Sequence, residues 1–478
     1  MLFGIYAFDF TTFVFMTDSY ANLQTLQRTF FRSGQSKSIN YRKKSLKDLK
    51  RIITQREALI FEALKKDLGK PTFESYISEV SVVLSDIEQA INYMKRWSRP
   101  ERVSGSLLNF PSKDYIYKEP YGLTLHISPW NYPFQLAFAP LVAAVAAGNT
   151  VVLKPSEHST FTSKVVEDII TEVFDSAHVA VVQGDATVAS ALLQLRWDYI
   201  FFTGSVAVGK IVAKAAATFL TPVTLELGGK NPCIIDQSAA LGLAAKRIVW
   251  GKFLNAGQTC IAPDYLLVHT SVYDTLVAKL ITEIKATYGK DPLLSTDYSR
   301  LIHRRHLERQ LSLLEGETVI CGGTYHLETN AMAPTLLAKP SIDSPVMKDE
   351  IFGPILPILT YDTFADIENC VDQYAKPLGF YVFSKNKRFI QTIIERFGFG
   401  GGSINDTMMQ FVNSRLPFGG VGESGIGAYH GKFGFDTFSH HKPVSHRATW
   451  FDAPLRYAPY KNKLRQAKWV ERLRSLFG

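Results

Sequence analysis

Cysteines are few in this 478-residue sequence, and they are scattered along it. The four of them, Cys233, Cys260, Cys321 and Cys370, include no C-x-x-C pair. A disulfide framework and a cysteine-ligated metal site are therefore excluded as the basis of the fold, and no metal is expected. Because this cysteine usage does not call for oxidising conditions, a reducing cytoplasm is the expected location.

The sequence also lacks a convincing targeting signal at its apolar start. Residues 1–16 have no basic beginning and no small-residue cleavage site, and Asp9 interrupts them. They are shorter than the about 20 apolar residues that a membrane-spanning helix needs. One hypothesis is that Met16 is the native start and that residues 1–15 are a translation-start artefact.

Positive charge is in small excess, and it gathers at the C-terminal end. The formal net charge is +9, and residues 461–478 hold six lysines and arginines against one glutamate. Nucleic acid is not an expected partner, because no recognisable nucleic-acid-binding motif accompanies the charge. Val470, Leu473 and Phe477 fall on one helical face of this tail, which suits peripheral contact with an anionic membrane surface. A solvated basic terminus explains the same residues equally well.

The composition is that of a globular protein of several domains, with 46% hydrophobic and 20% charged residues. Apolar residues at helical spacing predict two long amphipathic helices, over 46–64 and 80–94. After them, short β-branched runs alternate with helical segments, which is typical of parallel sheets covered on both faces. The runs are Leu123–Ile127, Thr150–Leu153, Val179–Val182, Tyr199–Phe202, Val223–Leu225 and Cys233–Ile235, then Tyr265–Val268, Leu356–Leu359, Phe380–Phe383 and Ser403–Asn405.

These two series of strands predict an α/β protein with two doubly wound parallel-sheet domains, divided near Gly228–Gly229. Pro357 indicates that the run over 356–359 is an edge strand or only begins there. The segment Asp114–Tyr121, with its alternating tyrosines, predicts an extended excursion outside the sheets. The glycines at 420, 422 and 425 match G-x-G-x-x-G, but they neither end a strand nor open a helix, so we interpret them as a tight loop.

More specific signals come from six longer sequence motifs, four of which lie at the ends of predicted strands. They are ISPWNYPF (127–134), LKPSE (153–157), FFTGS (201–205), LELGGK (225–230), FLNAGQTCIAPD (253–264) and EIFGP (350–354). The carboxyl ends of strands are where α/β proteins place ligand-binding groups. From about Tyr41 to about His440, the set resembles the aldehyde dehydrogenase superfamily. The words GQTCIAPDY and GAYHGKFGFDTFSH are similar to its class 3 branch, which includes enzymes for fatty and aromatic aldehydes.

The resemblance implies a domain plan with a Rossmann-like cofactor domain, a catalytic domain and a small β arm. The expected ranges are 17–112 and 122–227 for the NAD(P)-binding domain, 228–425 for the catalytic domain, 113–121 and 426–450 for the bridging and oligomerisation arm, and 451–478 for the basic tail. An arm of this kind implies a homodimer, because an exposed sheet edge generally needs a partner.

The resemblance also implies a catalytic set of Cys260, Asn131 and Glu226. A cysteine thiolate adds to an aldehyde and later leaves as a thioester. We expect the site to lower the thiol pKa through backbone dipoles or the nicotinamide cation. The Asn131 amide and the Cys260 backbone N–H match donors for the oxyanion, and Glu226 matches the base that activates water. The other three cysteines are expected to be structural.

The cofactor implied is NAD, with NADP use left open. Lys154 and Glu157 match positions that hold the adenine ribose, where a carboxylate disfavours a 2′-phosphate. Ser205 is placed for the pyrophosphate at a helix N-terminus, with Gly209 allowing close packing of that helix. Glu350 and Phe352 match residues beside the nicotinamide ribose and ring. The full expected cofactor set is Lys154, Glu157, Thr203, Gly204, Ser205, Gly209, Leu227, Glu350 and Phe352.

The expected substrate is a small-molecule lipophilic aldehyde, fatty or aromatic, which is oxidised to a carboxylate. Residues at class 3 pocket positions are Tyr132, Leu136, Trp250, Leu254 and Met408, and their aromatic and aliphatic character favours lipophilic substrates. Ordinary core residues would give the same pattern. Two alternatives stay open: a coenzyme A-acylating or phosphorylating aldehyde dehydrogenase, and a non-catalytic dinucleotide-binding scaffold.

Overall fold

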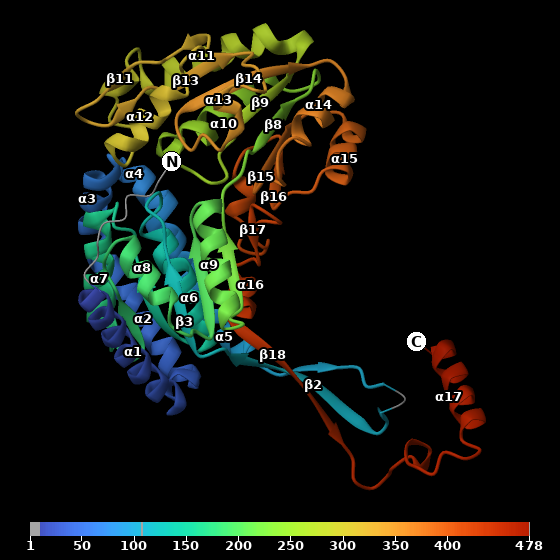
Figure 1. Ribbon diagram of the computed structural model, residues 1–478. Helices are drawn as coiled ribbons and strands as arrows, with labels where there is room; N and C mark the ends of the chain where they lie inside the picture. Colours follow the sequence, from blue (N-terminus) through green and yellow to red (C-terminus); the bar gives the residue numbers. More distant parts are fainter. Residues whose placement is uncertain (1–9, 107–108, 478) are drawn as a thin grey trace.

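The computed structural model describes residues 10–106 and 109–477, with the side chains of 10–18, 470 and 473–477 left out. The hypothesis about residues 1–15 therefore falls largely outside the described residues, and so does the helical face of Val470, Leu473 and Phe477. The described chain forms two bodies joined side by side, with a long arm projecting from one of them (Figure 1).

The first body is built on a sheet of order β17-β7-β6-β3-β4-β5. All neighbouring strands in it are parallel except β17, which runs antiparallel to β7. The strands are β3 (Leu123–Ile127), β4 (Thr150–Lys154), β5 (Val179–Val181), β6 (Tyr199–Thr203), β7 (Val223–Glu226) and β17 (Gly425–Ile426). The predicted parallel sheet is thus confirmed.

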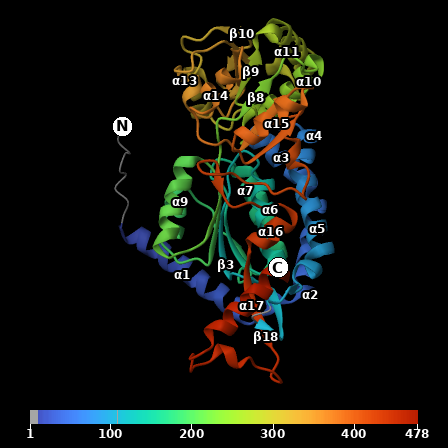
Figure 2. The same ribbon diagram turned by 90° about the vertical axis from the view of Figure 1, so that its right-hand side faces the viewer.

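Helices cover both faces of this sheet, because alternate residues of its strands point to opposite sides. In β6, Phe201 packs into the core beneath one helical layer, and Ile200 and Phe202 pack beneath the other. The first layer holds α2 (Ile39–Gln55), α3 (Glu57–Leu68), α5 (Ser81–Trp97), α6 (Gln135–Ala147) and α7 (Thr160–Val173). The second holds α1 (Phe10–Arg32), α8 (Ala186–Leu193) and α9 (Val206–Thr218), as Figure 2 shows.

The amphipathic run predicted over 46–64 is divided between two helices, which corrects the expectation of a single one. The backbone leaves helical geometry at Arg56, between α2 and α3, and α3 then packs against α7. Gly69 ends α3 with a positive φ of 63°, a conformation that glycine adopts without strain. The second predicted helix corresponds to α5.

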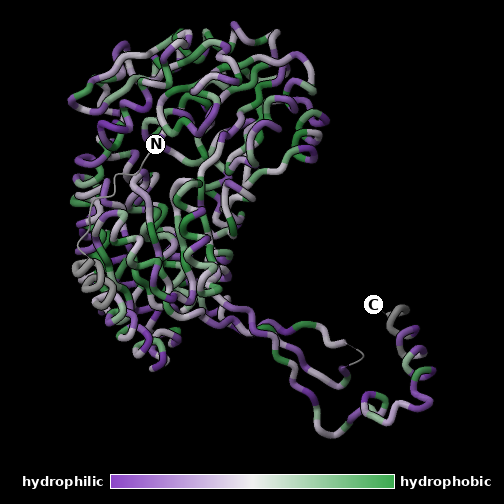
Figure 3. Tube along the Cα trace, in the orientation of Figure 1, coloured by the Kyte–Doolittle hydropathy of each residue, from purple (hydrophilic) through white to green (hydrophobic). Residues whose placement is uncertain are grey.

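The second body is built on a sheet of order β10-β13-β14-β9-β8-β15-β16, parallel except for β10. Its strands are β8 (Pro232–Ile235), β9 (Tyr265–His269), β10 (Val319–Cys321), β13 (Thr335–Ala338), β14 (Ile355–Tyr361), β15 (Gly379–Phe383) and β16 (Gly401–Ile404). Its helices are α10 (Leu241–Phe253), α11 (Tyr273–Tyr288), α12 (Arg304–Ser312), α13 (Pro345–Lys348), α14 (Phe364–Val371) and α15 (Lys387–Arg396). Figure 3 shows hydrophobic residues concentrated along the central strands.

Pro357 does not place its strand at an edge, because β14 lies between β13 and β9. The pairing of β14 with β9 begins only at Ile358, one residue after the proline. The proline, which has no N–H to donate, therefore precedes the ladder on that side. The expectation of an edge strand is wrong. The expectation that the strand begins at the proline applies only to the side of β14 that pairs with β9.

The arm is a three-stranded antiparallel sheet of β1 (Glu101–Val103), β2 (Ser112–Pro120) and β18 (Ser439–Arg447). β2 and β18 pair along their whole length and project from the first body, and α17 (Leu464–Phe477) lies beyond them (Figure 1). The segment α16 (Gly431–Thr437) packs instead against α5 and α6. Among the described helices, none combines the length and apolar character that crossing a membrane requires. The ranges expected for the domains and the membrane contact of the tail stay predictions.

A buried ion pair joins the N-terminal helices to the segment that leads into α6. Lys70 and Glu79 are both fully buried, with Lys70 Nζ 2.5 Å from Glu79 Oε1. The second carboxylate oxygen of Glu79 accepts hydrogen bonds from the backbone N–H groups of Phe134 and Gln135, each at 2.9 Å, where α6 begins. Glu79 therefore both neutralises a buried ammonium group and caps a helix.

Replacing Glu79 by alanine is expected to lower the free energy of unfolding by about 3–5 kcal/mol, because the Lys70 charge is left buried without a partner. Chemical denaturation followed by circular dichroism measures the change. The matched control is Glu88→Ala, which removes an exposed ion pair with Lys50 on the same helical layer and is expected to cost at most about 1 kcal/mol. Equal losses in the two variants would contradict this account.

Candidate active site

The sequence motifs that follow the strands of the first sheet lie together at one edge of that sheet. Asn131 follows β3, Lys154 ends β4, Thr203 ends β6 and Glu226 ends β7. Because these strands are parallel, their carboxyl ends lie on the same side of the sheet. The residues that the sequence analysis placed at strand carboxyl ends therefore share one edge of the sheet.

Cys260 lies on the loop between α10 and β9 of the second body. Just before it, Asn255, Ala256 and Gly257 all have left-handed backbone, with φ of 53°, 51° and 75°. At Gly257 a Cβ atom would lie 2.3 Å from the carbonyl oxygen of Gly353, so only glycine fits there. This turn directs the following residues, Gln258 to Cys260, towards the first body.

Hydrogen bonds tie this loop to the Asn131 segment across the two bodies. The Asn131 side-chain amide donates to the Gln258 carbonyl at 3.0 Å, and the Asn255 amide donates to the Asn131 carbonyl at 2.8 Å. The Tyr132 hydroxyl lies 2.6 Å from the hydroxyl of Thr259, the neighbour of Cys260. The expected nucleophile and the expected oxyanion donor are therefore held in a fixed relation.

The ion pair of Lys70 with Glu79 supports the same segment from below. Lys70 Nζ donates to the Asn131 carbonyl at 3.3 Å and lies 4.3 Å from the centre of the Tyr132 ring. Glu74 completes the support, because it accepts the backbone N–H of Asn255 at 2.9 Å. Sequence reasoning missed this network. Its only signal in the sequence was a lysine between Gly69 and Pro71, at the end of a helical run.

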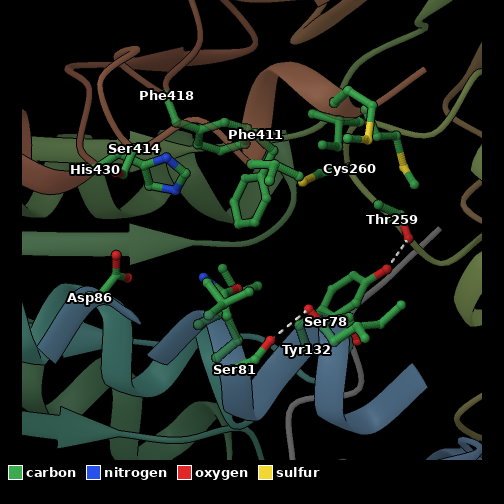
Figure 4. A pocket seen from close by; sticks show the side chains of 18 of the residues that line it. Ser78, Ser81, Asp86, Tyr132, Thr259, Cys260, Phe411, Ser414, Phe418 and His430 are labelled. Atoms are coloured by element: carbon green, nitrogen blue, oxygen red, sulfur yellow. Dashed lines mark hydrogen bonds between the residues drawn. The ribbon is translucent and has the colours of Figure 1, made fainter. Parts of the chain in front are cut away.

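A cavity of about 500 Å³ opens in front of Cys260. Figure 4 shows Cys260, Thr259 and Tyr132 together on one side of it. Glu226 and Thr203 also line it, and so do all five residues expected for the substrate pocket: Tyr132, Leu136, Trp250, Leu254 and Met408. An interpretation of these five as ordinary core residues does not explain why all of them line the cavity, although most of them are also buried.

Two further segments line this cavity, and the sequence analysis did not find them. One is the turn and helix around α5, and the other is the loop region from 409 to 430. Their lining residues are Ile77, Ser78, Ser81, Val82, Ser85, Asp86, Met409, Phe411, Val412, Ser414, Phe418, Tyr429 and His430. The serines at 78, 81 and 85 recur at helical spacing on a face opposite to the apolar one, which was their available signal.

Glu226 is almost completely buried, with 3% of its surface exposed. Within the described part of the chain, neither of its carboxylate oxygens has a hydrogen-bond partner. Burial therefore raises the pKa of Glu226 well above its usual range. A carboxyl group with free oxygens at the wall of a cavity is suited to accept a proton from a water molecule there.

Burial also raises the pKa of the Cys260 thiol, and the carboxylates of Glu350 and Glu226 raise it further. The backbone N–H groups of Cys260 and Ile261 act in the opposite direction, but more weakly. The backbone dipoles thus act in the expected direction, but desolvation outweighs them within the protein's own groups. The expected effect of the nicotinamide cation stays a prediction. The two carboxylates act on the sulfur because all three groups lie close together.

The residues expected to bind the cofactor lie along the strand ends and the start of α9. Lys154 Nζ is 2.6 Å from a Glu157 carboxylate oxygen. Ser205 caps α9 by accepting a hydrogen bond from the backbone N–H of Val208 at 3.4 Å. A Cβ atom at Gly209 would lie 2.6 Å from the side chain of Leu227, so this glycine allows α9 to approach β7 closely. Gly204 lies between Thr203 and the Ser205 cap.

Glu350 and Phe352 come from the second body and face the same region. The Glu350 carboxylate lies against Gly228, where a Cβ atom would be 1.9 Å from its oxygen. Burial raises the pKa of Glu350 to about 8. Phe352, with a φ of 52°, stacks edge-on against the Trp130 ring, with ring centres 5.4 Å apart.

The glycines at 420, 422 and 425 form a tight turn, as expected, and do not begin a helix. Gly422 and Gly425 form an antiparallel bridge, and Gly425 begins β17 beside Glu226. A Cβ atom at Gly425 would lie 2.4 Å from the Leu225 carbonyl oxygen. Within the described residues, no group of histidine, cysteine, aspartate and glutamate side chains is arranged to hold a metal.

Curated relatives of this chain are aldehyde dehydrogenases. It is 45% identical to a 4,4'-diaponeurosporen-aldehyde dehydrogenase of Staphylococcus aureus, over 92% of this chain and 96% of the relative. It is 42% identical to aldehyde dehydrogenase family 3 member A2 of Mus musculus, over 93% of this chain and 92% of the relative. It is 43% identical to "Aldehyde dehydrogenase, dimeric NADP-preferring" of Rattus norvegicus, over 87% of this chain and 92% of the relative.

Solved structures agree with these relatives. A substrate-bound AldH of Staphylococcus aureus matches with a TM-score of 0.93 and 44% identity, over 95% of this chain and 99% of the other. The NAD+ complex of an aldehyde dehydrogenase from Bacillus cereus matches with a TM-score of 0.82 and 26% identity, over 90% of this chain and 89% of the other.

The resemblance noted in the sequence, including its class 3 character, is confirmed by the family 3 relative. The sequence profile described as "Aldehyde dehydrogenase family" matches residues 26–444, which is most of the chain. The chain therefore belongs to the aldehyde dehydrogenase family of oxidoreductase enzymes.

Proposed function

We propose that this enzyme oxidises lipophilic aldehydes to carboxylates with NAD(P), through a thioester on Cys260. The observation that carries the proposal is that Cys260 and the unpartnered carboxyl of Glu226 line one largely apolar cavity. A nucleophile and a base that face one cavity can act on the same bound carbonyl carbon.

In the proposed reaction, the Cys260 sulfur adds to the aldehyde carbon and forms a thiohemiacetal. The Asn131 side chain uses one N–H in its bond to Gln258, which leaves its second N–H for the developing oxyanion beside the Cys260 backbone N–H. Bound NAD(P) supplies the acceptor for the departing hydride. Glu226 then takes a proton from water as that water attacks the thioester carbon, and the sulfur leaves as the carboxylate product forms.

The residues of the first body fit a dinucleotide. Ser205 places the N-terminus of a 13-residue helix at the sheet edge, which suits a pyrophosphate. The Thr203 hydroxyl is buried without a hydrogen-bond partner among the described groups, and Lys154 and Glu157 offer a donor and an acceptor for a ribose. The NAD+ complex of the Bacillus cereus relative and the NADP preference in the name of the rat relative support NAD(P) as the cofactor.

The cavity wall supports a lipophilic substrate. Near Cys260 it consists of Tyr132, Leu136, Trp250, Leu254 and Met408, which offer few polar groups to a small polar aldehyde. The Staphylococcus aureus relative is named for 4,4'-diaponeurosporen-aldehyde. Glu226 argues against an acylating enzyme, because such an enzyme passes the thioester to coenzyme A and needs no base for water.

Replacing Glu226 by glutamine is expected to preserve a burst of about one NADH per site from a long-chain aldehyde and to slow the steady state about 10²- to 10⁴-fold, because hydrolysis loses its base. Stopped-flow absorbance measures both phases. Cys260→Ala is expected to abolish burst and turnover together, and Cys321→Ala, which changes a partly buried cysteine away from the cavity, is the matched control. Wild-type turnover in Cys260→Ala, or a coenzyme A requirement for product formation, would refute the proposal.

Replacing Glu157 by glutamine is expected to raise the ratio of kcat/KM with NADP to that with NAD by about tenfold, because a carboxylate that repels a 2′-phosphate is removed. Parallel assays with the two cofactors measure the ratio. Glu172→Gln, on α7 away from the strand ends, serves as the control. An unchanged ratio in Glu157→Gln would show that this carboxylate does not face the ribose.

We propose further that the enzyme is a homodimer joined through the arm. The arm leaves sheet edges at β1 and β18 with no partner strand in the described chain, and Trp450 just beyond it is 75% exposed. Open edges and exposed aromatic side chains are typical of association surfaces. The rat relative has "dimeric" in its name.

Sedimentation equilibrium is expected to give twice the 53.5 kDa chain mass at micromolar concentration. Trp450→Glu is expected to weaken the association, because it places a charge in the buried part of the interface. The control is Leu294→Glu, which changes an equally exposed residue of the second body, between α11 and α12. A single 53.5 kDa species for the unaltered protein at every concentration would contradict the dimer.

A further inference from the structure

The cavity in front of Cys260 carries a carboxylate at its other end. Asp86, on α5, lines the cavity, and the reaction proposed above does not use it. Figure 4 shows Asp86, Ser414 and His430 on the side of the cavity opposite Cys260 and Thr259. Asp86, Tyr429 and His430 also border a smaller adjoining cavity, so they form the far wall of the larger one.

The helix that carries Asp86 runs along the cavity. Ser78, Ser81, Ser85 and Asp86 all line it, and they follow one another along the turn and helix over 76–97. At about 1.5 Å per step, the eight steps from Ser78 to Asp86 span roughly 12 Å. A chain bound along this wall, with its carbonyl at Cys260, would bring its far end to Asp86.

Asp86 has no hydrogen bond and no ion pair among the described residues, and the residues that line the cavity include no lysine or arginine. The Tyr429 hydroxyl interacts electrostatically with Asp86 but does not hydrogen-bond to it. Burial raises the pKa of Asp86 to about 7. A carboxyl group in such surroundings is destabilised unless a ligand or water supplies a hydrogen bond.

His430 adds a second polar group to this wall. Its side chain is 6% exposed, and its Nδ1 has no hydrogen-bond partner among the described groups. Burial lowers the pKa of His430 to about 4, so the imidazole is neutral near pH 7. A neutral imidazole offers one donor and one acceptor, but it does not supply the cation that Asp86 would need for an ion pair.

We propose that Asp86 and His430 form a second recognition point, which binds a hydroxyl group at the far end of a lipophilic aldehyde. The inference rests on the proposed function and names its substrate class. A hydroxyl group donates its hydrogen to the Asp86 carboxyl and meets the imidazole with its oxygen, at no cost in charge. A terminal carboxylate would be repelled by Asp86, and a terminal methyl group would leave both polar groups unsatisfied.

The test compares three straight-chain aldehydes of equal, medium length, which end in a methyl, a hydroxyl or a carboxylate group. For the wild-type enzyme, kcat/KM is expected to be about 10- to 100-fold higher for the hydroxyl compound than for the methyl compound, and lowest for the carboxylate. The difference is expected mainly in KM, because the recognition point lies away from the reacting carbon.

Asp86→Leu is expected to reverse the order of the hydroxyl and methyl compounds, and Asp86→Asn is expected to raise kcat/KM for the carboxylate compound at least about tenfold. The conservative asparagine keeps the shape of the side chain and guards against misfolding. Glu88→Gln removes a charge from an exposed position of the same helix and is expected to leave all three values unchanged.

Equal kcat/KM for the hydroxyl and methyl compounds in the wild type, or a hydroxyl preference that survives Asp86→Leu, would overturn the recognition point while leaving the proposed function intact. Such a result would assign the Asp86 carboxyl to bound water. The absence of NADH from all three aldehydes, together with long-chain and aromatic ones, would overturn the proposed function and the recognition point with it.

Discussion

The chemistry of this enzyme depends on the contact that holds the Asn131 segment against the Cys260 loop. The Asn255 amide donates to the Asn131 carbonyl, and the Asn131 amide donates to the Gln258 carbonyl. The buried ion pair of Lys70 with Glu79, together with the Glu74 carboxyl, supports these two loops. A buried charged group is strongly destabilising when it loses its ion-pair or hydrogen-bond partner. Such groups therefore restrict the positions of the residues that they contact. The energetic cost of burying these groups is therefore linked to the placement of Asn131 and Cys260, the proposed catalytic groups.

The cavity combines two kinds of surroundings for its carboxyl groups. Neither Glu226 nor Asp86 has a hydrogen-bond partner among the described groups, and burial raises the pKa of both. Glu226 lies at the sheet edge near Cys260, whereas Asp86 lies on the far wall. Tyr429, which also lines the cavity, interacts electrostatically with both carboxyl groups. Position along the cavity, more than residue type, distinguishes the proposed base from the proposed recognition group.

Much of this arrangement could be predicted from the sequence, because strands that are buried on both faces leave continuous β-branched runs. All ten predicted runs correspond to strands, and the words at their ends meet at one edge. The arm was expected as an extended segment over 114–121 and as a small β arm, but β10, β13 and β17 were not predicted. They have three, four and two residues, which is too short for a periodicity to be recognised. The break at Arg56 was missed because apolar spacing continues across it.

The far wall of the cavity was missed for a different reason. Asp86 and His430 lie 344 positions apart in the sequence and come together only through the packing of α16 against α5, so no local pattern marks them. The sign of the Cys260 pKa shift was also beyond sequence reasoning, because it depends on how much water burial removes and on the distances to Glu226 and Glu350.

The strand β17 has a consequence for biosynthesis. It adds the last strand to a sheet whose other members come from residues 123–226, and the loop around it supplies much of the cavity wall. While the ribosome is still making the second body, the first body has an open edge beside Glu226 and no enclosed pocket. The cavity can thus be completed only after nearly all of the chain has been synthesised.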